Sequence, residues 1–432
     1  MYFLYNLLLT LAFIVLLPYF LLRMLTAGKS AGNLKEKFGF LALSSNSERG
    51  EDTIWLHAVS VGEATAVAPL AAAIRERYPK SRLVVSTTTA TGQAVARKKI
   101  AIADDWIYFP FDFPSSVARA LDRVAPRLVV LVESELWPNF LKAARKRDVA
   151  VMVANGRISD RTFVRLTKLK RIAQFLYRNV SLFAMQTEED GRRAIALGAP
   201  EGSVIVAGNL KYDVAVPPLS QAAWSGLNGT RLIIAGSTGE GEDEIVLEAF
   251  KHLLERSPDC ASIRLLIAPR HPERFSSVAT LAASRGLKVE RRSSGEPVGA
   301  AQVLLLDTVG ELSSLYSAAT VVFVGGSLLP YGGHNVLEPA SFARPIIVGP
   351  FMDNFRAITE EFLAQGALVQ IVSRLKDDQV NELAGVFHSI LSDNQKAEHL
   401  GQNALRTFQA NRGSTLRHLA AIEKLLVPSL NS

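Results

Sequence analysis

The stretch of sequence that decides the fold is WLHAVSVGEATAVAPL, residues 55–70. It begins as an apolar run typical of a buried strand and ends in small residues with a helical pattern. The Val-Gly-Glu between the two halves marks the point where a strand passes directly into a helix. The stretch therefore predicts a strand-to-helix junction that carries a carboxylate, Glu63.

The same alternation continues along the chain. Short apolar runs such as RLVVST (82–87) and RLVVLVES (127–134) are separated by helical stretches such as PSSVARALDRVA (114–125). Strands of continuous apolar character, interleaved with helices, indicate a parallel sheet that is covered on both faces. The alternation stops and then restarts at RLIIAGST (231–238). We therefore expect an α/β protein with two Rossmann-like, doubly wound domains.

The predicted domain boundaries follow from these breaks. We expect a membrane anchor over 1–27, an N-terminal domain over 28–212, a linker over 213–229, a C-terminal domain over 230–400 and terminal helices over 401–432. The linker contains two prolines and several turn-forming residues. Because open α/β sheets bind ligands at the carboxyl ends of their strands, two such domains facing each other predict a central cleft.

Composition excludes some classes of site. The chain has 432 residues and a formal net charge of +7, which suggests an anionic partner such as a nucleotide, a nucleic acid or a membrane surface. Charge alone does not choose among them. The single cysteine, Cys260, excludes a disulfide within the chain and a zinc site with several cysteines, and is interpreted as structural.

The N-terminus predicts contact with a membrane. Residues 2–22 carry no charge and are numerous enough to span a bilayer. No basic segment precedes them and no cleavage site follows, which argues against a signal peptide. Arg23, Lys29, Lys35 and Lys37 follow the segment, so the positive-inside rule places the remaining chain on the cytoplasmic face. The alternative is a helix that lies in the membrane interface.

Four candidate residues for chemistry lie in the N-terminal half. Glu63 is a candidate general base, or a glutamate that only helps a helix to start. Glu133 and Glu135 follow another strand, either as an acid cluster of a site or as part of a solvated loop. Lys211 lies next to the linker and suits an anionic substrate, unless it is simply a surface lysine.

The C-terminal half offers further strand ends. APRHPERF (268–275) presents Arg270 and His271, and TVGELSSLY (308–316) presents Gly310 and Glu311. In the segment 322–349, Asn335 occupies an N-cap position with Glu338 three residues later, which fits a capping box or a nucleotide held at a helix N-terminus. The glycine-rich stretch 235–244 is a weaker candidate for a phosphate cradle.

Six motifs together resemble a known family. HAVSVGE, ESELWPN, GNLKYD, PRHPERF, TVGEL and GGSLLPYGGHNVLEPA occur in order over most of the chain. They are similar to the Kdo transferases of Gram-negative bacteria, which transfer 3-deoxy-D-manno-octulosonic acid during lipopolysaccharide assembly. The resemblance implies an inverting GT-B glycosyltransferase at the inner membrane that moves Kdo from CMP-Kdo to the lipid A precursor, lipid IVA.

The resemblance also implies residue roles. Glu63 would be the general base, and Glu133 and Lys211 would stabilise the transition state. The residues implied in binding the donor are Pro269, Arg270, Val309, Gly310, Glu311, Asn335, Val336, Leu337 and Glu338. Val309 stands where the family usually has methionine.

The departing group would be a phosphate monoester, already a good leaving anion, and the sequence lacks an Asp-x-Asp motif. We therefore expect no cofactor and no obligatory metal, with CMP-Kdo, lipid IVA and the inner-membrane bilayer as partners and no nucleic acid. Two alternatives stay open. One is a GT-B transferase or epimerase that uses a UDP-sugar, and the other is a membrane-tethered nucleotide-binding protein without catalysis.

Overall fold

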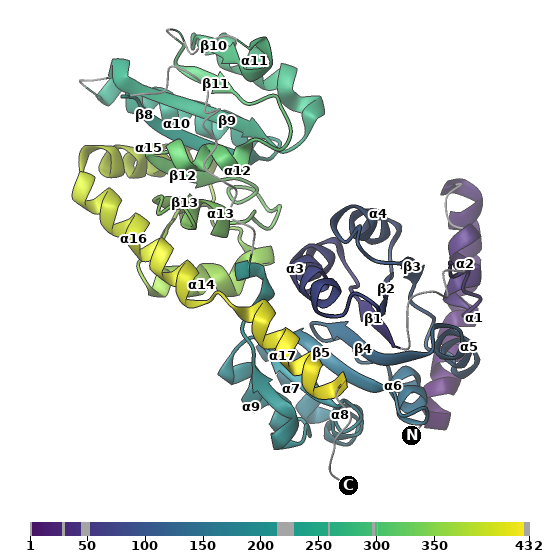
Figure 1. Ribbon diagram of the computed structural model, residues 1–432. Helices are drawn as coiled ribbons and strands as arrows, with labels where there is room; N and C mark the ends of the chain where they lie inside the picture. Colours follow the sequence, from purple (N-terminus) through teal and green to yellow (C-terminus); the bar gives the residue numbers. More distant parts are fainter. Residues whose placement is uncertain are drawn as a thin grey trace. The chain divides into compact units, whose positions relative to one another are not determined.

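The computed structural model of the chain describes residues 2–27, 31–44, 52–213, 229–257, 260–295, 299 and 301–426. The chain divides into two units, residues 1–213 with 412–432 and residues 214–411. Each unit is built around a parallel sheet (Figure 1). The predicted α/β class with two doubly wound domains is therefore confirmed. Most of the predicted linker, from residue 214 to residue 228, lies outside the described residues.

The sheet of unit 1 has seven strands in the order β3-β2-β1-β4-β5-β6-β7. In its centre, Leu56 of β1 pairs with Val85 of β2 on one side and with Val130 of β4 on the other. The strands are β1 (Thr53–His57), β2 (Arg82–Thr87), β3 (Asp105–Tyr108), β4 (Pro126–Val132), β5 (Ala150–Gly156), β6 (Leu182–Met185) and β7 (Val204–Val206).

Alternate residues of these strands enter two different apolar cores. Trp55 and Val129 belong to one core, whereas Ile54 and Leu128 belong to the other. Both faces of the sheet are therefore covered, which is why its strands read as continuous apolar runs. The covering helices are α3 (Val61–Arg77), α4 (Ala90–Lys99), α5 (Pro114–Val124), α6 (Pro138–Arg145), α7 (Asp160–Lys168), α8 (Lys170–Tyr177), α9 (Glu188–Ala196) and α17 (Ser414–Leu426).

The sheet of unit 2 also has seven parallel strands, in the order β10-β11-β9-β8-β12-β13-β14. They are β8 (Arg231–Thr238), β9 (Ile263–Pro269), β10 (Val289–Arg291), β11 (Val303–Leu305), β12 (Val321–Val324), β13 (Ile346–Val348) and β14 (Val369–Gln370). The helices of this unit are α10 (Glu242–Arg256), α11 (Phe275–Ser284), α12 (Leu312–Leu315), α13 (Leu337–Ala340), α14 (Arg356–Ala364), α15 (Lys376–Ser392) and α16 (Asn394–Ala410).

The terminal helices divide between the units. Helix α16 belongs to unit 2, and α17 belongs to unit 1. Ala421 and Ile422 of α17 join the core that contains Ile54 and Leu128. The sequence predicted one terminal segment, 401–432, but its first helix and its last helix pack in different units.

The N-terminal helix α1 (Tyr2–Ala27) packs against unit 1 through specific contacts. The Tyr5 hydroxyl donates to Asp112, the Asn139 amide donates to Asn6, and the ring of Phe13 meets that of Phe111 edge-on. Over the described part of the chain, none of the helices combines the length and the apolar character needed to cross a membrane. The predicted spanning anchor is therefore not supported, because one side of this apolar helix is used to contact its own domain.

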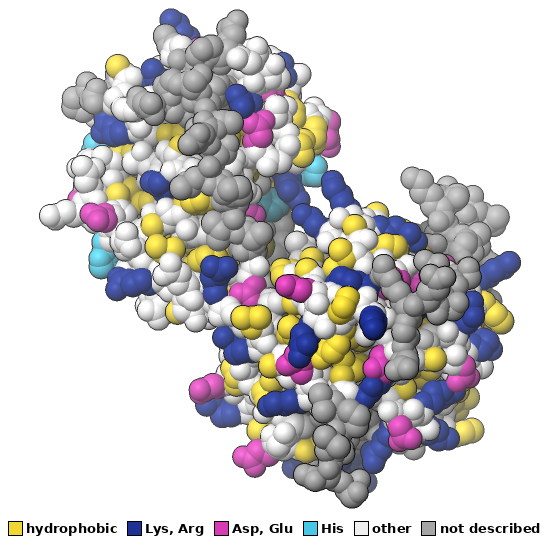
Figure 2. All heavy atoms as spheres, in the orientation of Figure 1, with side chains coloured by type: hydrophobic (Ala, Val, Ile, Leu, Met, Phe, Trp, Pro, Cys, Tyr) yellow, Lys and Arg dark blue, Asp and Glu magenta, His cyan; other side chains and the backbone are white. Residues whose placement is uncertain are grey.

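Charge is distributed over the surface. Figure 2 shows Lys and Arg side chains mixed with Asp and Glu on the visible face of each unit, rather than gathered in one stripe. On this face, the net charge of +7 does not form a continuous basic surface.

Candidate active site

Glu63 lies at the carboxyl end of β1, in the first turn of α3. Ser60 caps this helix, and its hydroxyl accepts a hydrogen bond from the Glu63 amide at 3.3 Å. The Glu63 carboxylate in turn accepts from the Val59 amide and from the Ser60 hydroxyl, both at 2.8 Å. These contacts are close to those of a capping box, with the amide of Val59 in place of the Ser60 amide, so Glu63 does help α3 to start.

The electrostatics of Glu63 go beyond this capping role. Burial raises its pKa to about 7, although the hydrogen bonds from Val59 and Ser60 lower it. The nearby charges of Glu133 and Glu135 raise it further. A carboxylate that only starts a helix is expected to be fully ionised at neutral pH, because the helix dipole favours the charge. A carboxylate with a pKa near 7 is instead suited to accept a proton at neutral pH.

Glu133 follows β4 and has a strained backbone. Its φ is 64°, a left-handed conformation that is uncommon for a residue other than glycine, and its amide donates to the carbonyl of Ala154 at 2.8 Å. Burial raises the pKa of the neighbouring Glu135, and the charge of Glu133 raises it further. Backbone strain of this kind is common at functional sites. Glu63, Glu133 and Glu135 therefore form an acid cluster at one edge of the unit 1 sheet.

Lys211 lies on a 3-10 turn, η2 (Leu210–Asp213), which packs against α3 and α17. The Lys211 amide donates to the Asn209 side chain at 3.0 Å, and the Leu210 amide donates to the Asn155 side chain at 2.9 Å. The side chains of Asn155 and Asn209 therefore hold the backbone of this turn at Leu210 and Lys211. The structure places Lys211 on the same unit as Glu63, next to the helix that Glu63 begins.

A buried polar network supports this turn, and sequence reasoning missed it. Asn155 is fully buried at the end of β5 with a φ of 55°. Its backbone amide donates to Nε2 of His418 at 2.9 Å. Burial lowers the pKa of His418 to about 4, so the ring is neutral. Asp213 accepts from the amides of Gly413 and Thr415 at the start of α17. About 200 residues separate these partners in sequence, so no local pattern indicates the contact.

In unit 2, Pro269 ends β9 and Arg270 follows it. The Arg270 amide donates to the carbonyl of Thr238 at 3.0 Å, and its side chain is exposed. Arg274 is the arginine of this motif that is anchored, in an ion pair with the buried Asp243. Burial lowers the pKa of His334 to about 4, and the positive charge of Arg270 lowers it further, so Arg270 and a neutral His334 lie close together.

The glycine-rich stretch 235–244, predicted as a weak candidate for a phosphate cradle, contains a carboxylate that binds backbone amides itself. The carboxylate of Glu242 is fully buried and accepts hydrogen bonds from the amides of Gly326, Ser327 and Leu328, at 2.6 to 2.8 Å, as well as from Gly239. The protein's own carboxylate therefore takes the place that an anion would occupy. This contact fixes the loop that leads to His334 and Asn335.

The remaining predicted donor residues lie on two short loops. Asn335 accepts a hydrogen bond from the Leu337 amide at 3.0 Å and donates to Glu338 at 3.2 Å. Glu338 also accepts from the Ser313 hydroxyl of α12. Helix α13, which begins at Leu337, has only four residues, so the expected nucleotide site at a helix dipole gains no support. Val336 and Leu337 are buried beside this turn.

The loop between β11 and α12 is open. Val309 is 81% exposed, and Gly310 has a φ of 99° with no atom within 4 Å of the position of a Cβ. The nearby Thr308 hydroxyl and the ion pair with Arg292 lower the pKa of Glu311. Through Ser313 and Glu338, this loop is connected to the loop of Asn335. The structure therefore brings the Glu311 and Asn335 motifs together at one edge of the unit 2 sheet.

Two predictions about the site stay open. In the ranges that the structure describes, no group of three His, Cys, Asp or Glu residues is placed to hold a metal ion. The expectation that no metal is obligatory stays a prediction. The expectation that both site edges face one cleft concerns the placement of the two units and also stays a prediction.

Comparison with known proteins agrees with these motifs. The sequence model of a family described as 3-deoxy-D-manno-octulosonic-acid transferase matches residues 32–214. The 3-deoxy-D-manno-octulosonic acid transferase of Haemophilus influenzae is 33% identical over 399 residues, which is 91% of each chain. The chain belongs to this family. The transferase of the same description from Bordetella pertussis is 34% identical and covers 86% of this chain and 87% of its own.

Solved structures also resemble this transferase. The UDP-GlcNAc 2-epimerase of Neisseria meningitidis is 14% identical, with a TM-score of 0.54, over 87% of this chain and all of the epimerase. That likeness shows the fold alone. The C-terminal CMP-Kdo binding domain of WaaA from Acinetobacter baumannii is 32% identical over 42% of this chain and 91% of that domain, with a TM-score of 0.39.

Proposed function

We propose that this transferase moves Kdo from CMP-Kdo to the lipid A precursor, lipid IVA, in a single inverting displacement with Glu63 as the general base. The observation that carries the proposal is the Glu63 carboxylate, half-buried at a strand end, whose pKa is raised to about 7. At neutral pH, a carboxylate with this pKa is ionised in about half of the molecules, and it is basic enough to accept a proton from a hydroxyl. Membership of the Kdo transferase family supports the reaction class.

The proposed roles of the unit 1 residues follow from their charges. An acceptor hydroxyl attacks the anomeric carbon of the sugar while its proton passes to Glu63. Lys211 stabilises the negative charge that develops on the donor, because an oriented cation in a partly dry site is an effective electrostatic catalyst. Glu133 contributes a second carboxylate beside Glu63, and its charge helps to keep the pKa of the base high.

The proposed donor site lies in unit 2. Arg270 binds the phosphate of CMP-Kdo, because its exposed guanidinium can make two parallel hydrogen bonds to phosphate oxygens. Glu338 and Asn335, held together by their mutual hydrogen bond, bind the ribose hydroxyls. Pro269, Val309, Gly310, Glu311, Val336 and Leu337 complete the donor site. The phosphate of CMP leaves without help from a metal ion.

We also propose that the enzyme works at the cytoplasmic face of the inner membrane, with α1 lying in the interface. Side chains on the outward side of α1 are apolar and exposed, with Phe3 at 82% and Val15 at 75%. Leu4, Leu8 and Leu11 are also exposed by half or more. An exposed apolar helix beside basic residues is typical of interfacial membrane binding. Replacing Leu8 and Leu11 with glutamate should abolish co-sedimentation with anionic vesicles.

The test is transfer itself. The purified protein is incubated with lipid IVA and either CMP-Kdo or a panel of UDP-sugars, and the products are weighed by mass spectrometry. A mass increase of one or more Kdo units with CMP-Kdo only is the expected result. Transfer or epimerisation of a UDP-sugar would contradict the proposal. Glu63→Gln should abolish transfer while calorimetry still detects CMP binding, because base and nucleotide belong to different units.

A further inference from the structure

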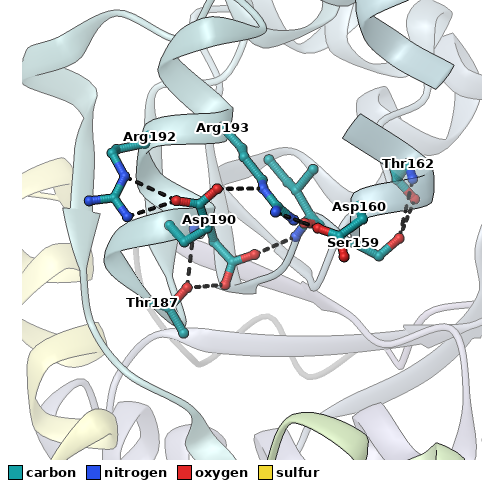
Figure 3. A network of polar contacts seen from close by, with 9 residues as sticks. Ser159, Asp160, Thr162, Thr187, Asp190, Arg192 and Arg193 are labelled. Carbon is teal, nitrogen blue, oxygen red and sulfur yellow. Dashed lines mark hydrogen bonds and ion pairs between the residues drawn. The ribbon is translucent and has the colours of Figure 1, made fainter. Parts of the chain in front are cut away.

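Arg157 follows β5 on a loop that is fixed by a polar network, shown in Figure 3. The Ile158 amide donates to Asp190 at 2.7 Å, and the Ile158 carbonyl accepts from Arg193 at 2.7 Å. Arg193 also pairs with Asp160, and the Thr187 hydroxyl donates to Asp190 at 2.6 Å. Helix α9 therefore holds the backbone on the carboxyl side of Arg157 in one conformation.

The other side of Arg157 is fixed as well. The carbonyl of Gly156 accepts a hydrogen bond from the Gln186 amide at 2.9 Å. A Cβ on Gly156 would lie 2.5 Å from the sulfur of Met185, so the side chain of Met185 packs directly over this part of the backbone. The arginine is therefore displayed from a rigid position, which lowers the entropy lost when it binds a ligand.

The guanidinium itself is unused. Within the described ranges, Arg157 has neither a hydrogen bond nor an ion pair, although its side chain is half-buried. It lines the same narrow crevice as Glu133 and Ser134, at the carboxyl edge of the neighbouring strand β4. Arg192 and Arg193 of the neighbouring helix α9 are both in ion pairs. An arginine held in place beside them without an ion pair therefore points to a ligand.

We propose that Arg157 binds a phosphate monoester of the acceptor substrate beside the proposed catalytic cluster. A phosphorylated acceptor that approaches Glu63, Glu133 and Glu135 meets three carboxylates, and a guanidinium nearby offsets that repulsion. The planar fork of an arginine can make two hydrogen bonds to phosphate oxygens. This inference rests on the proposed function, because it assumes that unit 1 binds the acceptor.

The test compares Arg157→Gln with a matched control, Arg161→Gln, which removes an exposed arginine four residues later on α7. Each variant is assayed with the phosphorylated disaccharide acceptor and with acceptors lacking one or both phosphates, at saturating donor. We expect Arg157→Gln to lower kcat/KM on the phosphorylated acceptor by about 10- to 100-fold, the range for a hydrogen bond to a charged group. On the acceptor that lacks the bound phosphate, the loss should be less than about threefold.

The outcomes separate the two proposals. An equal loss of kcat/KM on all acceptors, or no loss, would overturn the role of Arg157. An effect confined to the KM of the donor would also overturn it, because Arg157 would then bind the phosphate of the donor. If a dephosphorylated acceptor is not turned over, its inhibition constant against the standard reaction gives the same comparison. Thermal unfolding of each variant excludes loss of fold. Absence of transfer in the wild type would refute the proposed function instead.

Discussion

The strongest prediction concerns the group that tunes Glu63. Ser60 donates a hydrogen bond to the Glu63 carboxylate at 2.8 Å, and this contact favours the ionised form. Replacing Ser60 with alanine removes it and should raise the pKa of Glu63. A hydrogen bond to a charged group contributes about 1.5 kcal/mol at the lower end of its range, and 1.36 kcal/mol corresponds to one pKa unit. Because Ser60 is exposed, water replaces part of the loss, and we expect a shift of about one unit.

This shift has a defined signature in a pH–rate profile. In the wild type, kcat/KM should be half-maximal at about pH 7, level off above about pH 8 and fall about tenfold per pH unit below about pH 6, because only ionised Glu63 accepts a proton. In Ser60→Ala the midpoint should move from about 7 to about 8. At pH 7 the rate should therefore fall by about fivefold, whereas at pH 9 the two proteins should differ little.

Two further variants make the test specific. Thr65→Ala removes a hydroxyl that donates to the Val61 carbonyl on the same helix, and it should leave the midpoint unchanged. Glu135→Gln removes a charge that raises the pKa of Glu63, so its midpoint should move to lower pH. The assay is the initial rate of transfer between pH 5.5 and 9.5. An unchanged or lowered midpoint in Ser60→Ala, or a retained acidic limb in Glu63→Gln, would refute the reasoning.

Three other predictions concern stability. Glu242→Gln should lower the free energy of unfolding by about 3 kcal/mol in denaturant titrations, because buried amides lose an acceptor, whereas the exposed Glu240→Gln should not. Tyr5→Phe should cost about 1 kcal/mol, measured in the same way, because the buried Asp112 loses a donor. His418 has a lowered pKa, so the stability that it contributes is present above about pH 6.5 and is lost as the pH falls toward 4; His418→Gln should flatten this part of the pH dependence of unfolding.

The sequence predicted the buried strands well, because continuous apolar runs are required wherever helices cover both faces of a sheet. It missed β10, whose residues Val289–Arg291 are largely charged and lie at the sheet edge. It also could not assign α17 to unit 1. That assignment depends on Asp213 and His418, whose partners are distant in sequence. Arg157 carries no motif, and only the pairing of its neighbours shows that it is unused.

Three Gly-Glu turns show where sequence reasoning about the site reaches its limit. Each follows a strand and precedes a helix, yet their carboxylates differ in what surrounds them. Glu242 is fully buried and accepts four backbone hydrogen bonds, so it is committed to holding a loop. Glu311 pairs with Arg292.

Glu63 accepts only two hydrogen bonds, lies half-buried near two other carboxylates, and has a pKa raised to about 7. Of these three turns, it is the one whose charge is not already compensated by an arginine or by a full set of donors. The Gly-Glu dipeptide is the same in all three. The chemistry is decided by how many donors the rest of the fold supplies, which is why the acid-base assignment required the structure.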